Sequence, residues 1–267
     1  MWTFADLIKH FFTHKDFLPG ADQLPGTLFT PLHVLLALMW ALAVAAAVFF
    51  VSKKSERGIR RVFAVLWVFV LVLEVSKILW ETYCGKSVRF EWGGILPLYP
   101  CSIFMYAMPF AIWGKGCVRR AACGYVCSLG LLGGLINFVY PANILSNYSC
   151  VSFAGAHTFF YHGSIVFCAL TMLISGYHSY TWVQRPRQLL VPAGPFLIVS
   201  VIANAVNFSS IDSDYMFFKL ESFIFAPLGR ATADWVAVIL VYAAYLLIHA
   251  LPYLPHFLLI RTKTKAR

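Results

Sequence analysis

The chain alternates long runs of apolar residues with short polar segments, and this pattern sets its fold class. Seven of the runs approach or exceed the length of about 20 residues that crosses the hydrocarbon core of a bilayer. They lie at residues 31–51, 62–80, 98–114, 121–140, 157–176, 189–208 and 234–251. The pattern therefore predicts an all-α, polytopic membrane protein with seven transmembrane helices.

The first thirty residues follow a different pattern. Their apolar residues recur at helical spacing, with polar residues on the other side, and no charged start precedes a continuous apolar core. We therefore expect an amphipathic helix in the membrane interface, and no signal peptide. The predicted organisation is an interfacial helix with its linker at 1–30, a transmembrane domain at 31–260 and a basic tail at 261–267.

Composition and charge placement support this interpretation. The sequence is 60% hydrophobic and only 12% charged, against about 25% charged residues in soluble proteins. Its net charge is +10, and fourteen Lys and Arg residues fall in the loops on one side against six on the other. By the positive-inside rule the N-terminus faces out and the C-terminus faces the cytoplasm. The positive charge serves topology, and no basic soluble domain is present to bind nucleic acid.

Two further features concern packing and pairing. The fourth run, "AACGYVCSLGLLGGLINFVY", is rich in glycine, which predicts a helix that packs closely against its neighbours. The seven cysteines cannot all pair. Cys84 and Cys150 fall in loops on the same predicted outer side, which leaves a disulfide between them open.

Polar residues inside the predicted spans gather at one depth. Given the predicted topology, every span offers a polar group to the outer half of the membrane, and only His249 lies toward the inner end. Because each intramembrane ionisable group costs at least about 2.5–3.5 kcal/mol, we expect a polar cavity that opens outward. Its predicted members are His33, Glu74, Lys77, Cys101, Asn137, Tyr140, His157, His162, Asn204, Asn207 and Asp234.

Each of these residues also has a structural explanation. Glu74 and Lys77 share a helix face and can neutralise each other. His157 can lie at the interface as an amphipathic side chain. Asn204 and Asn207 can hold helices together, and Cys101 can pack as a small hydrophobic residue.

Two kinds of reactive site suit the set. In the first, His162 takes the proton of the Cys101 thiol and the thiolate attacks an acyl carbonyl. Glu74 would then orient the imidazole, or Lys77 and an asparagine amide would stabilise the oxyanion. The second is a metal site of His33, His157 and His162. The spacing of the last two puts them about 140° apart around a helix, which is poor for a shared ion, so no metal site is predicted.

Three motifs carry a family resemblance. "LPLYPC" opens the third run, "HTFFYHGSIVF" opens the fifth, and "ANAVNF…DSDYMFFK…FAPLG…DWV" joins the last two. In order and spacing they resemble the YwaF-type seven-helix bacterial integral membrane proteins, over nearly the whole chain. That group is similar to a eukaryotic transmembrane acyltransferase that remodels ether phospholipids through an acyl-cysteine, and more distantly to membrane hydrolases of fatty-acid esters. The resemblance places the cysteine at Cys101 and the histidine at His162, with His33 and Asn207 also at family-like positions.

The chain departs from the family pattern beside the cysteine. Family members often have histidine where Tyr99 stands, and an acidic residue where Ser102 follows the cysteine. A missing polar partner next to the thiol indicates a different arrangement of base and oxyanion donors. A different substrate, or hydrolysis in place of transfer, would follow from that.

The sequence therefore predicts a membrane-embedded lipid acyltransferase or lipid-ester hydrolase of the bacterial inner membrane. Cys101 and His162 are the predicted catalytic residues, supported by Glu74, Lys77, Asn207, His33, Asn204 and Asp234. Membrane lipids are the expected partners, and no cofactor is expected because the acyl donor lies in the bilayer. A proton-coupled solute transporter and a non-catalytic lipid-binding membrane protein are the alternatives.

Overall fold

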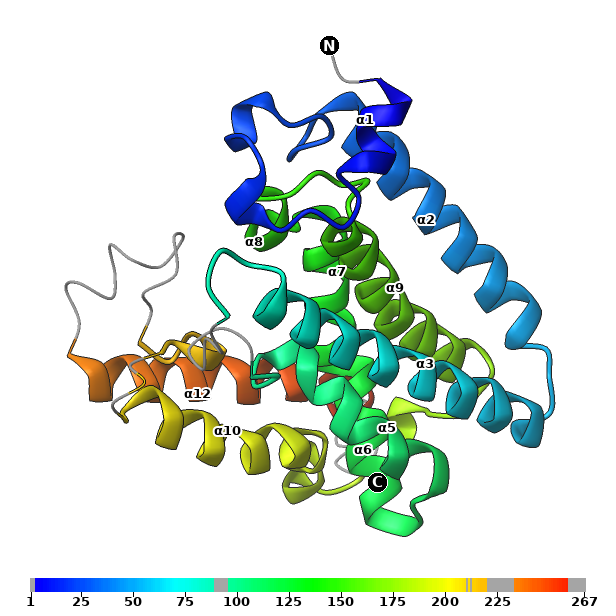
Figure 1. The fold of residues 1–267 in the computed structure, drawn as a ribbon. Coiled ribbons are helices and arrows are strands. Elements are labelled where there is room, and N and C mark those ends of the chain that lie inside the picture. Colours follow the sequence, from blue (N-terminus) through cyan, green and yellow to red (C-terminus); the bar gives the residue numbers. More distant parts are fainter. Residues whose placement is uncertain (1–2, 89–95, 210, 212, 220–232, 259–267) are drawn as a thin grey trace, which may run out of the picture. The chain divides into compact units, whose positions relative to one another are not determined.

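The structure is a computed structural model that describes residues 3–88, 96–209, 211, 213–219 and 233–258. The predicted basic tail at 261–267 and the "FAPLG" motif lie outside the described residues. Every regular element within them is helical (Figure 1). The α-helices are α1 (Phe4–Lys9), α2 (Pro31–Val51), α3 (Glu56–Tyr83), α5 (Ile103–Trp113), α6 (Gly116–Tyr125), α7 (Leu131–Val139), α8 (Ala142–Leu145), α9 (Phe153–Ile174), α10 (Gly194–Asn207) and α12 (Asp234–Ala250).

Shorter helical segments connect or extend these helices. A π-helical segment, η4 (Val126–Gly130), joins α6 to α7. The other short segments are 3₁₀ turns: η1 (Lys15–Phe17), η2 (Ala21–Gln23), η3 (Pro100–Ser102), η5 (Tyr180–Trp182), η6 (Pro186–Ala193), η7 (Tyr215–Phe217) and η8 (Leu251–Tyr253).

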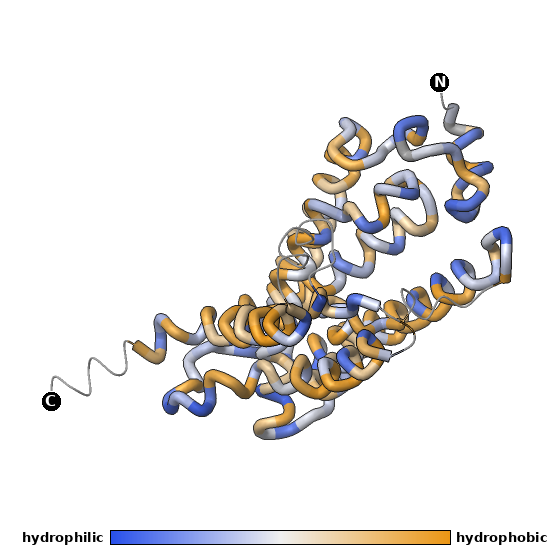
Figure 2. Tube along the Cα trace, turned by 90° about the vertical axis from the view of Figure 1, so that its left-hand side faces the viewer, coloured by the Kyte–Doolittle hydropathy of each residue, from blue (hydrophilic) through white to orange (hydrophobic). Residues whose placement is uncertain are grey.

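Six continuous helices are long and apolar enough to cross a membrane, and Figure 2 shows hydrophobic residues along most of their length. They span Pro31–Val51, Glu56–Tyr83, Gly116–Leu145, Phe153–Ile174, Pro186–Asn207 and Asp234–Leu258. The stretch predicted as the third span contains only the shorter apolar helix Pro100–Trp113. The prolines of this stretch delay the start of the helix, and the helix ends at Trp113, just before Gly114. Seven spans and their orientation are therefore not confirmed, whereas an integral membrane protein is.

Local caps explain where the first two long helices begin. Thr30 accepts a hydrogen bond from the backbone N–H of His33 at 3.4 Å, and Pro31 occupies the first turn of α2, where its missing N–H costs nothing. Ser55 caps α3 by accepting from Gly58 N–H at 3.3 Å. Because of this cap, α3 begins at Glu56, ahead of the apolar run that predicted it.

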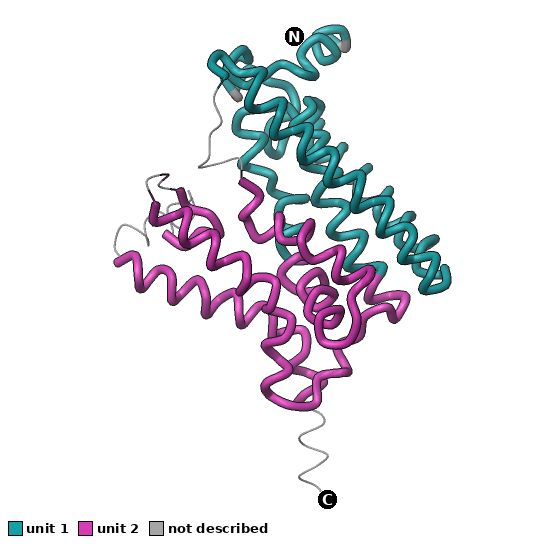
Figure 3. The backbone as a smooth tube through the Cα atoms, turned by 60° about the horizontal axis from the view of Figure 1, so that its bottom comes forward, with its two compact units in different colours: residues 1–91, 132–171 teal, residues 92–131, 172–267 magenta. Residues whose placement is uncertain are grey.

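The chain divides into two compact units, shown in teal and magenta in Figure 3. Unit 1 comprises residues 1–91 and 132–171, and unit 2 comprises 92–131 and 172–267. Each unit is built from segments that are distant in sequence. The helix Gly116–Leu145 contributes its first part to unit 2 and its remainder to unit 1, and α9 lies almost wholly in unit 1.

The transmembrane part of unit 1 is held together by aromatic rings and one close glycine contact. Phe63 of α3 packs edge-on against Phe167 of α9, with ring centroids 6.2 Å apart. A Cβ added at Gly134 of α7 would lie 3.1 Å from the side chain of Val166 in α9. The glycine therefore lets α7 and α9 approach closely, as the small residues of this run predicted.

The N-terminal segment packs against the rest of unit 1. Helix α1 has only six residues, shorter than the predicted amphipathic helix. Beyond it, the indole N–H of Trp80 donates to the carbonyl of Phe12 at 3.0 Å, and the rings of Phe12 and Phe153 lie 5.3 Å apart. These contacts tie the segment to the end of α3 and the start of α9.

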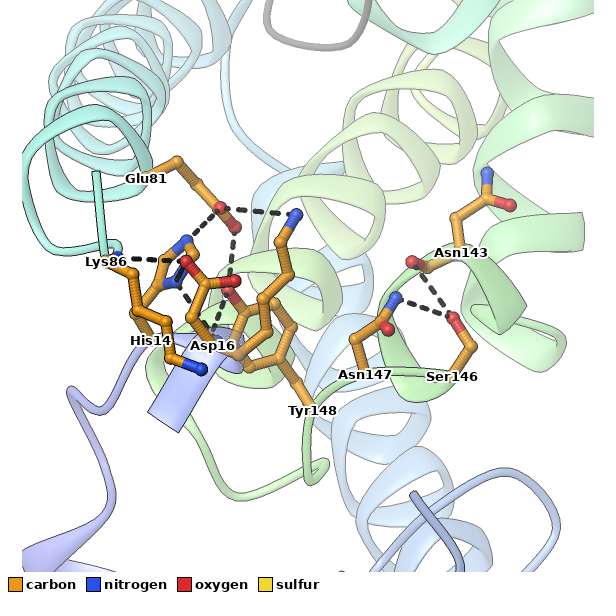
Figure 4. Close-up of polar contacts among 9 residues, drawn as sticks. His14, Asp16, Glu81, Lys86, Asn143, Ser146, Asn147 and Tyr148 are labelled. Carbon is orange, nitrogen blue, oxygen red and sulfur yellow. Dashed lines mark hydrogen bonds and ion pairs between the residues drawn. The ribbon is translucent and has the colours of Figure 1, made fainter. Parts of the chain in front are cut away.

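A polar network reinforces this attachment (Figure 4). Glu81 at the end of α3 lies 3.0 Å from the Nε2 atom of His14 and accepts a hydrogen bond from the Tyr148 hydroxyl at 3.1 Å. Asp16 accepts from the backbone N–H of Lys86 at 3.0 Å, which lowers the pKa of its carboxyl group. Burial and the nearby Glu81 carboxylate raise the pKa of Tyr148, so this phenol stays protonated and donates.

In unit 2 another glycine allows close packing between segments that are distant in sequence. A Cβ at Gly124 would lie 2.6 Å from the hydroxyl of Tyr253 and 2.9 Å from Pro192, so only glycine fits there. The Tyr253 hydroxyl is in turn 2.9 Å from the Nε2 atom of His178, in the loop after α9. Tyr180 completes this cluster, with its ring 4.8 Å from that of Tyr253.

Cys84 and Cys150 are free cysteines in the structure. Cys84 is exposed at the end of α3, whereas Cys150 is buried and its backbone N–H donates to the carbonyl of Gly26 at 3.0 Å. Burial raises the pKa of the Cys150 thiol to about 11, so it is protonated and inert at neutral pH.

Candidate functional site

Cys101 lies in a short helical turn of unit 2. Pro100 starts the turn η3, which continues into α5, and the hydroxyl of Tyr125 donates a hydrogen bond to the carbonyl oxygen of Pro100. The cysteine itself is partly exposed. The turn therefore fixes the backbone on which the thiol stands, and the residue is not fully covered by the protein.

Phenol groups surround this turn. Tyr99 stands two residues before Cys101, and the hydroxyl of Tyr125 donates to the carbonyl oxygen of Pro100, the residue next to the cysteine. The ring of Tyr99 packs against Tyr215 at 5.0 Å. The phenol of Tyr99 can donate a hydrogen bond, where a histidine at the same position could also accept a proton.

His162 lies in α9 of unit 1, and its tautomer is set by the backbone. Its Nδ1 atom is 2.8 Å from the carbonyl oxygen of Thr158, one turn earlier. Because a carbonyl oxygen only accepts, Nδ1 carries the proton and Nε2 carries the lone pair. This Nε2 atom is buried and has no hydrogen-bond partner within the described part of the chain. The imidazole is thus held in the tautomer whose Nε2 atom can accept a proton.

A charged cluster lies beside His162 in the same unit. The Glu74 carboxylate is 3.1 Å from the Nε2 atom of His157 and 3.9 Å from the Nζ atom of Lys77. The first contact is too poorly aligned for a full hydrogen bond, so it is mainly electrostatic. Tyr161 stacks on His157 at 5.7 Å and lies edge-on to His162 at 5.4 Å.

The contacts within this cluster differ from those expected from the sequence. Glu74 was expected to orient His162, but its nearest imidazole is that of His157, and the Thr158 carbonyl orients His162. A buried carboxylate needs a partner of opposite charge, which was the signal available in the sequence. That signal did not show which histidine, about eighty residues away, would supply it.

Two predicted site residues support backbone turns. The Nδ1 atom of His33 accepts from the N–H of Phe29 at 3.0 Å, and Phe29 has a left-handed φ of 59°. Asn207 is fully buried, and its amide binds both the N–H and the carbonyl of Tyr215, at 2.7 and 2.8 Å. This clamp lies next to Met216, another residue with a left-handed φ, of 60°. Both side chains therefore hold strained loop backbone in place.

The other two predicted residues lie on the last helices of unit 2. The amide of Asn204 donates to the Tyr242 hydroxyl at 3.1 Å, which joins α10 to α12. Asp234 is exposed in the first turn of α12, where a carboxylate is favoured by the helix dipole. Their surroundings match the interhelical and helix-end roles that these residue types commonly have.

His249 forms a second buried histidine site, in unit 2. Its Nδ1 atom is 2.7 Å from the Ser128 hydroxyl, which itself donates to the carbonyl of Gly124 at 2.7 Å. Nδ1 therefore carries the proton that Ser128 accepts. The ring packs against Tyr125 at 5.2 Å and Phe196 at 6.0 Å. Ser128 lies in the π-helical segment, and nothing in the sequence singled it out.

The structure thus gathers part of the predicted set in each unit. Unit 1 holds His33, Glu74, Lys77 and His162, together with His157; unit 2 holds Cys101, Asn204, Asn207 and Asp234. Because Cys101 and His162 belong to different units, their pairing stays a prediction. Among the described residues, no group of three or more His, Cys, Asp or Glu side chains is arranged to hold a metal ion.

Comparison with known proteins identifies the family. The sequence matches the TMEM164 family over residues 28–261, which is most of the chain, and the chain therefore belongs to that family of transmembrane proteins. No curated protein and no solved structure matches the chain. The match covers all six long apolar helices and the turn that carries Cys101. It does not confirm the assignment to the YwaF-type bacterial group.

Proposed function

We propose that this TMEM164 family member performs acyl-group chemistry on membrane lipids, with Cys101 as nucleophile and His162 as its base. The observation that carries the proposal is the fixed tautomer of His162. Its Nδ1 proton is committed to the Thr158 carbonyl, so its buried Nε2 atom is ready to accept a proton. The partial exposure of Cys101 at a helix start is what such a nucleophile needs.

The proposed reaction has two steps. His162 takes the thiol proton, and the Cys101 thiolate attacks the carbonyl carbon of a lipid ester. The ester C–O bond breaks, the lysolipid oxygen leaves with the proton from His162, and a thioester remains on Cys101. In the second step His162 takes a proton from the hydroxyl of an acceptor lysolipid, or from water, as that oxygen attacks the thioester. The proton then returns to the departing thiolate.

Two donors are candidates for stabilising the oxyanion. Tyr99 is a phenol two residues from the nucleophile, and its hydroxyl can donate a hydrogen bond. Lys77 is the cationic candidate in unit 1. Asn207 enters the proposal as a residue that positions the loop at Tyr215, because its amide is already hydrogen-bonded there.

The location follows from the same interpretation. We propose that the shorter helix Pro100–Trp113 completes a seventh crossing, with the N-terminus outside and the C-terminus in the cytoplasm, as the distribution of Lys and Arg indicates. The resemblance to YwaF-type proteins favours the bacterial inner membrane. The acyl donor and acceptor are both membrane lipids, so the chemistry requires no bound cofactor.

One observation favours a second candidate, a proton-coupled transporter. Glu74 and His157 are buried and Lys77 is partly exposed, and together they place ionisable groups within apolar helices. Such groups mark proton pathways in membrane proteins. His162 would extend this path, whereas Asp234 is exposed at the start of its helix. A non-catalytic lipid-binding protein needs neither the cluster nor the thiol.

The test is the intact mass of the purified protein after incubation with mixed phospholipids, with and without hydroxylamine. The wild type and the control Cys84→Ala, which removes another exposed thiol, should gain an acyl mass that hydroxylamine removes. Cys101→Ala should gain none. Addition of a lysophospholipid should discharge the adduct if the reaction is a transfer. An adduct that persists in Cys101→Ala, or no adduct in any variant across several lipid mixtures, would reject the proposal and favour transport.

A further inference from the structure

A groove on unit 1 lies outside the candidate site. It has a volume of about 510 Å³ and is lined by Arg61, Val62, Val65, Leu66 and Phe69 of α3 and by Phe160 of α9. This volume is within the range of about 300–1,000 Å³ that is common for small-molecule sites. Apart from Arg61, every lining residue is apolar.

The lining residues of α3 form one continuous face. Arg61, Val65 and Phe69 are spaced four residues apart, and residues at this spacing are neighbours on the surface of a helix. From Arg61 to Phe69 the face extends about 12 Å along the helix axis, at about 1.5 Å per residue. Val65 is 72% exposed and Phe69 is 53% exposed, so the protein itself does not cover the face.

Aromatic rings shape the groove. The ring of Phe160 packs edge-on against Phe69 at 5.3 Å and against Trp40 of α2 at 6.2 Å. Phe160 is thereby held between two helices, and it forms a rigid apolar side of the groove. A linear hydrocarbon chain along α3 would gain van der Waals contact with this ring and with the valines and leucine.

Charge is confined to one end of the groove. Residues 62–73 carry no charge, whereas five Lys and Arg residues lie between Lys53 and Arg61. Within this basic run, Arg60 is engaged by Glu56 at 2.9 Å, and Arg61 lines the groove. Arg61 is thus the last charge before the apolar run of α3, where lipid headgroups would lie at the end of a membrane-crossing helix. A guanidinium is well suited to bind a phosphate there.

We infer that this groove binds one acyl chain of an anionic phospholipid, whose phosphate lies against Arg61. An anionic headgroup is favoured over a zwitterionic one because the basic run adds further attraction. A second copy of this chain fits the groove less well. Two copies in one membrane have the same orientation, so their basic runs would meet at the same depth. The inference does not depend on the proposed acyl chemistry.

Native mass spectrometry of the full chain tests the inference. The purified protein is titrated with phosphatidylglycerol or with phosphatidylcholine of the same acyl chains. One phosphatidylglycerol should be retained per chain, in preference to phosphatidylcholine. Arg61→Gln should weaken its retention about fivefold, the equivalent of ~1 kcal/mol per basic residue. Val65→Trp fills the groove from an exposed position and should weaken retention of phosphatidylglycerol by at least as much.

Two matched controls separate the site from general effects. Lys54→Gln removes an exposed charge from the same basic run, and Val68→Trp enlarges a half-exposed position of α3 outside the groove. Both should change retention less than twofold. Equal losses in Arg61→Gln and Lys54→Gln would show diffuse surface attraction and overturn the inference. Unchanged retention in Val65→Trp, or a dimer that Val65→Trp disrupts, would overturn it as well.

Discussion

Two buried histidines of unit 1 and two of unit 2 have partners of different kinds. In unit 1, His14 contacts Glu81 and His157 contacts Glu74, so these imidazoles face carboxylates. In unit 2, the neighbours are hydroxyl groups: the Ser128 hydroxyl for His249 and the Tyr253 hydroxyl for His178. A carboxylate only accepts hydrogen bonds, whereas a hydroxyl is neutral and can both accept and donate.

The comparison is sharpest between His162 and His249. Both have Nδ1 in a hydrogen bond and a buried Nε2 without a partner among the described residues. His162, however, lies in the unit that holds the Glu74–Lys77 ion pair, next to Tyr161, which also stacks on His157. His249 lies among Tyr125 and Phe196. The local hydrogen bonds of the two rings are alike, and the neighbouring charges distinguish a candidate base from a packing residue.

The largest expected effect separates these two histidines by activity. His162→Gln should slow acyl-adduct formation on Cys101 by about 10²–10⁴-fold, the usual contribution of a general base. His249→Gln should change the rate less than threefold. The rate of adduct formation by mass spectrometry is the measurement, with thermal unfolding of each variant as a control for folding. Similar losses in both variants would remove the distinction drawn above.

Removal of the Glu74 carboxylate should break the charged cluster of unit 1. Glu74→Ala leaves Lys77 without its counter-charge and removes the carboxylate beside His157, which should lower the free energy of unfolding by up to about 3–5 kcal/mol. The control on the same helix is Glu56→Ala, whose exposed pair with Arg60 should contribute at most about 1 kcal/mol. Unfolding titrations in SDS measure both. A small effect of Glu74→Ala would mean that the cluster is open to water.

Acid should act on unit 2 through His178. Burial, with Arg119 adding to it, lowers the pKa of His178 to about 4, against about 6.5 in an unfolded chain. Between these values the unfolded chain binds more protons, so stability falls as the pH drops from 6.5 toward 4. The loss at pH 5 should be on the order of 2 kcal/mol. His178→Gln should flatten the stability profile from pH 7 to 5, and an unchanged slope would contradict the assignment.

The smallest effect tests the bond between Ser128 and His249. Ser128→Ala leaves the Nδ1 proton of a fully buried imidazole without an acceptor, at a cost of about 1–3 kcal/mol. Ser164 offers a matched control, because its hydroxyl also donates to a carbonyl four residues earlier, at 2.7 Å. Ser164→Ala removes that bond without leaving a histidine N–H unpaired. It should therefore lower the free energy of unfolding by about 1 kcal/mol less than Ser128→Ala does. Equal costs in unfolding titrations would show that His249 finds another acceptor.

Much of the architecture was predictable because it follows from local chemistry. The bounds of the first span were predicted as 31–51 and are Pro31–Val51, since a threonine cap and a proline start this helix and its apolar run is uninterrupted. The third span was predicted too long. Its prolines and Gly114 limit a helix that hydropathy alone does not delimit. Apolar length indicates what can enter a membrane, and backbone chemistry decides how much of it is helical.

The sequence named the candidate residues but did not predict their contacts. Sequence placed Glu74, Lys77 and His162 at one depth, and the structure brings these residues together in unit 1. It did not predict that Glu74 would contact His157, that the Thr158 carbonyl would orient His162, or that Asn207 would clamp a loop. Each of these depends on how side chains point once helices pack.

The sequence by itself determined the all-helical membrane fold, the places where charge accumulates and the residues that must find polar partners. These follow from the cost of placing polar groups in hydrocarbon, which depends on composition along a single helix. Only the tertiary structure decided which partner each group found, because contacts such as Ser128 with His249 join residues 121 positions apart in the chain. Their geometry is set by packing between helices, and no local pattern in the sequence encodes it.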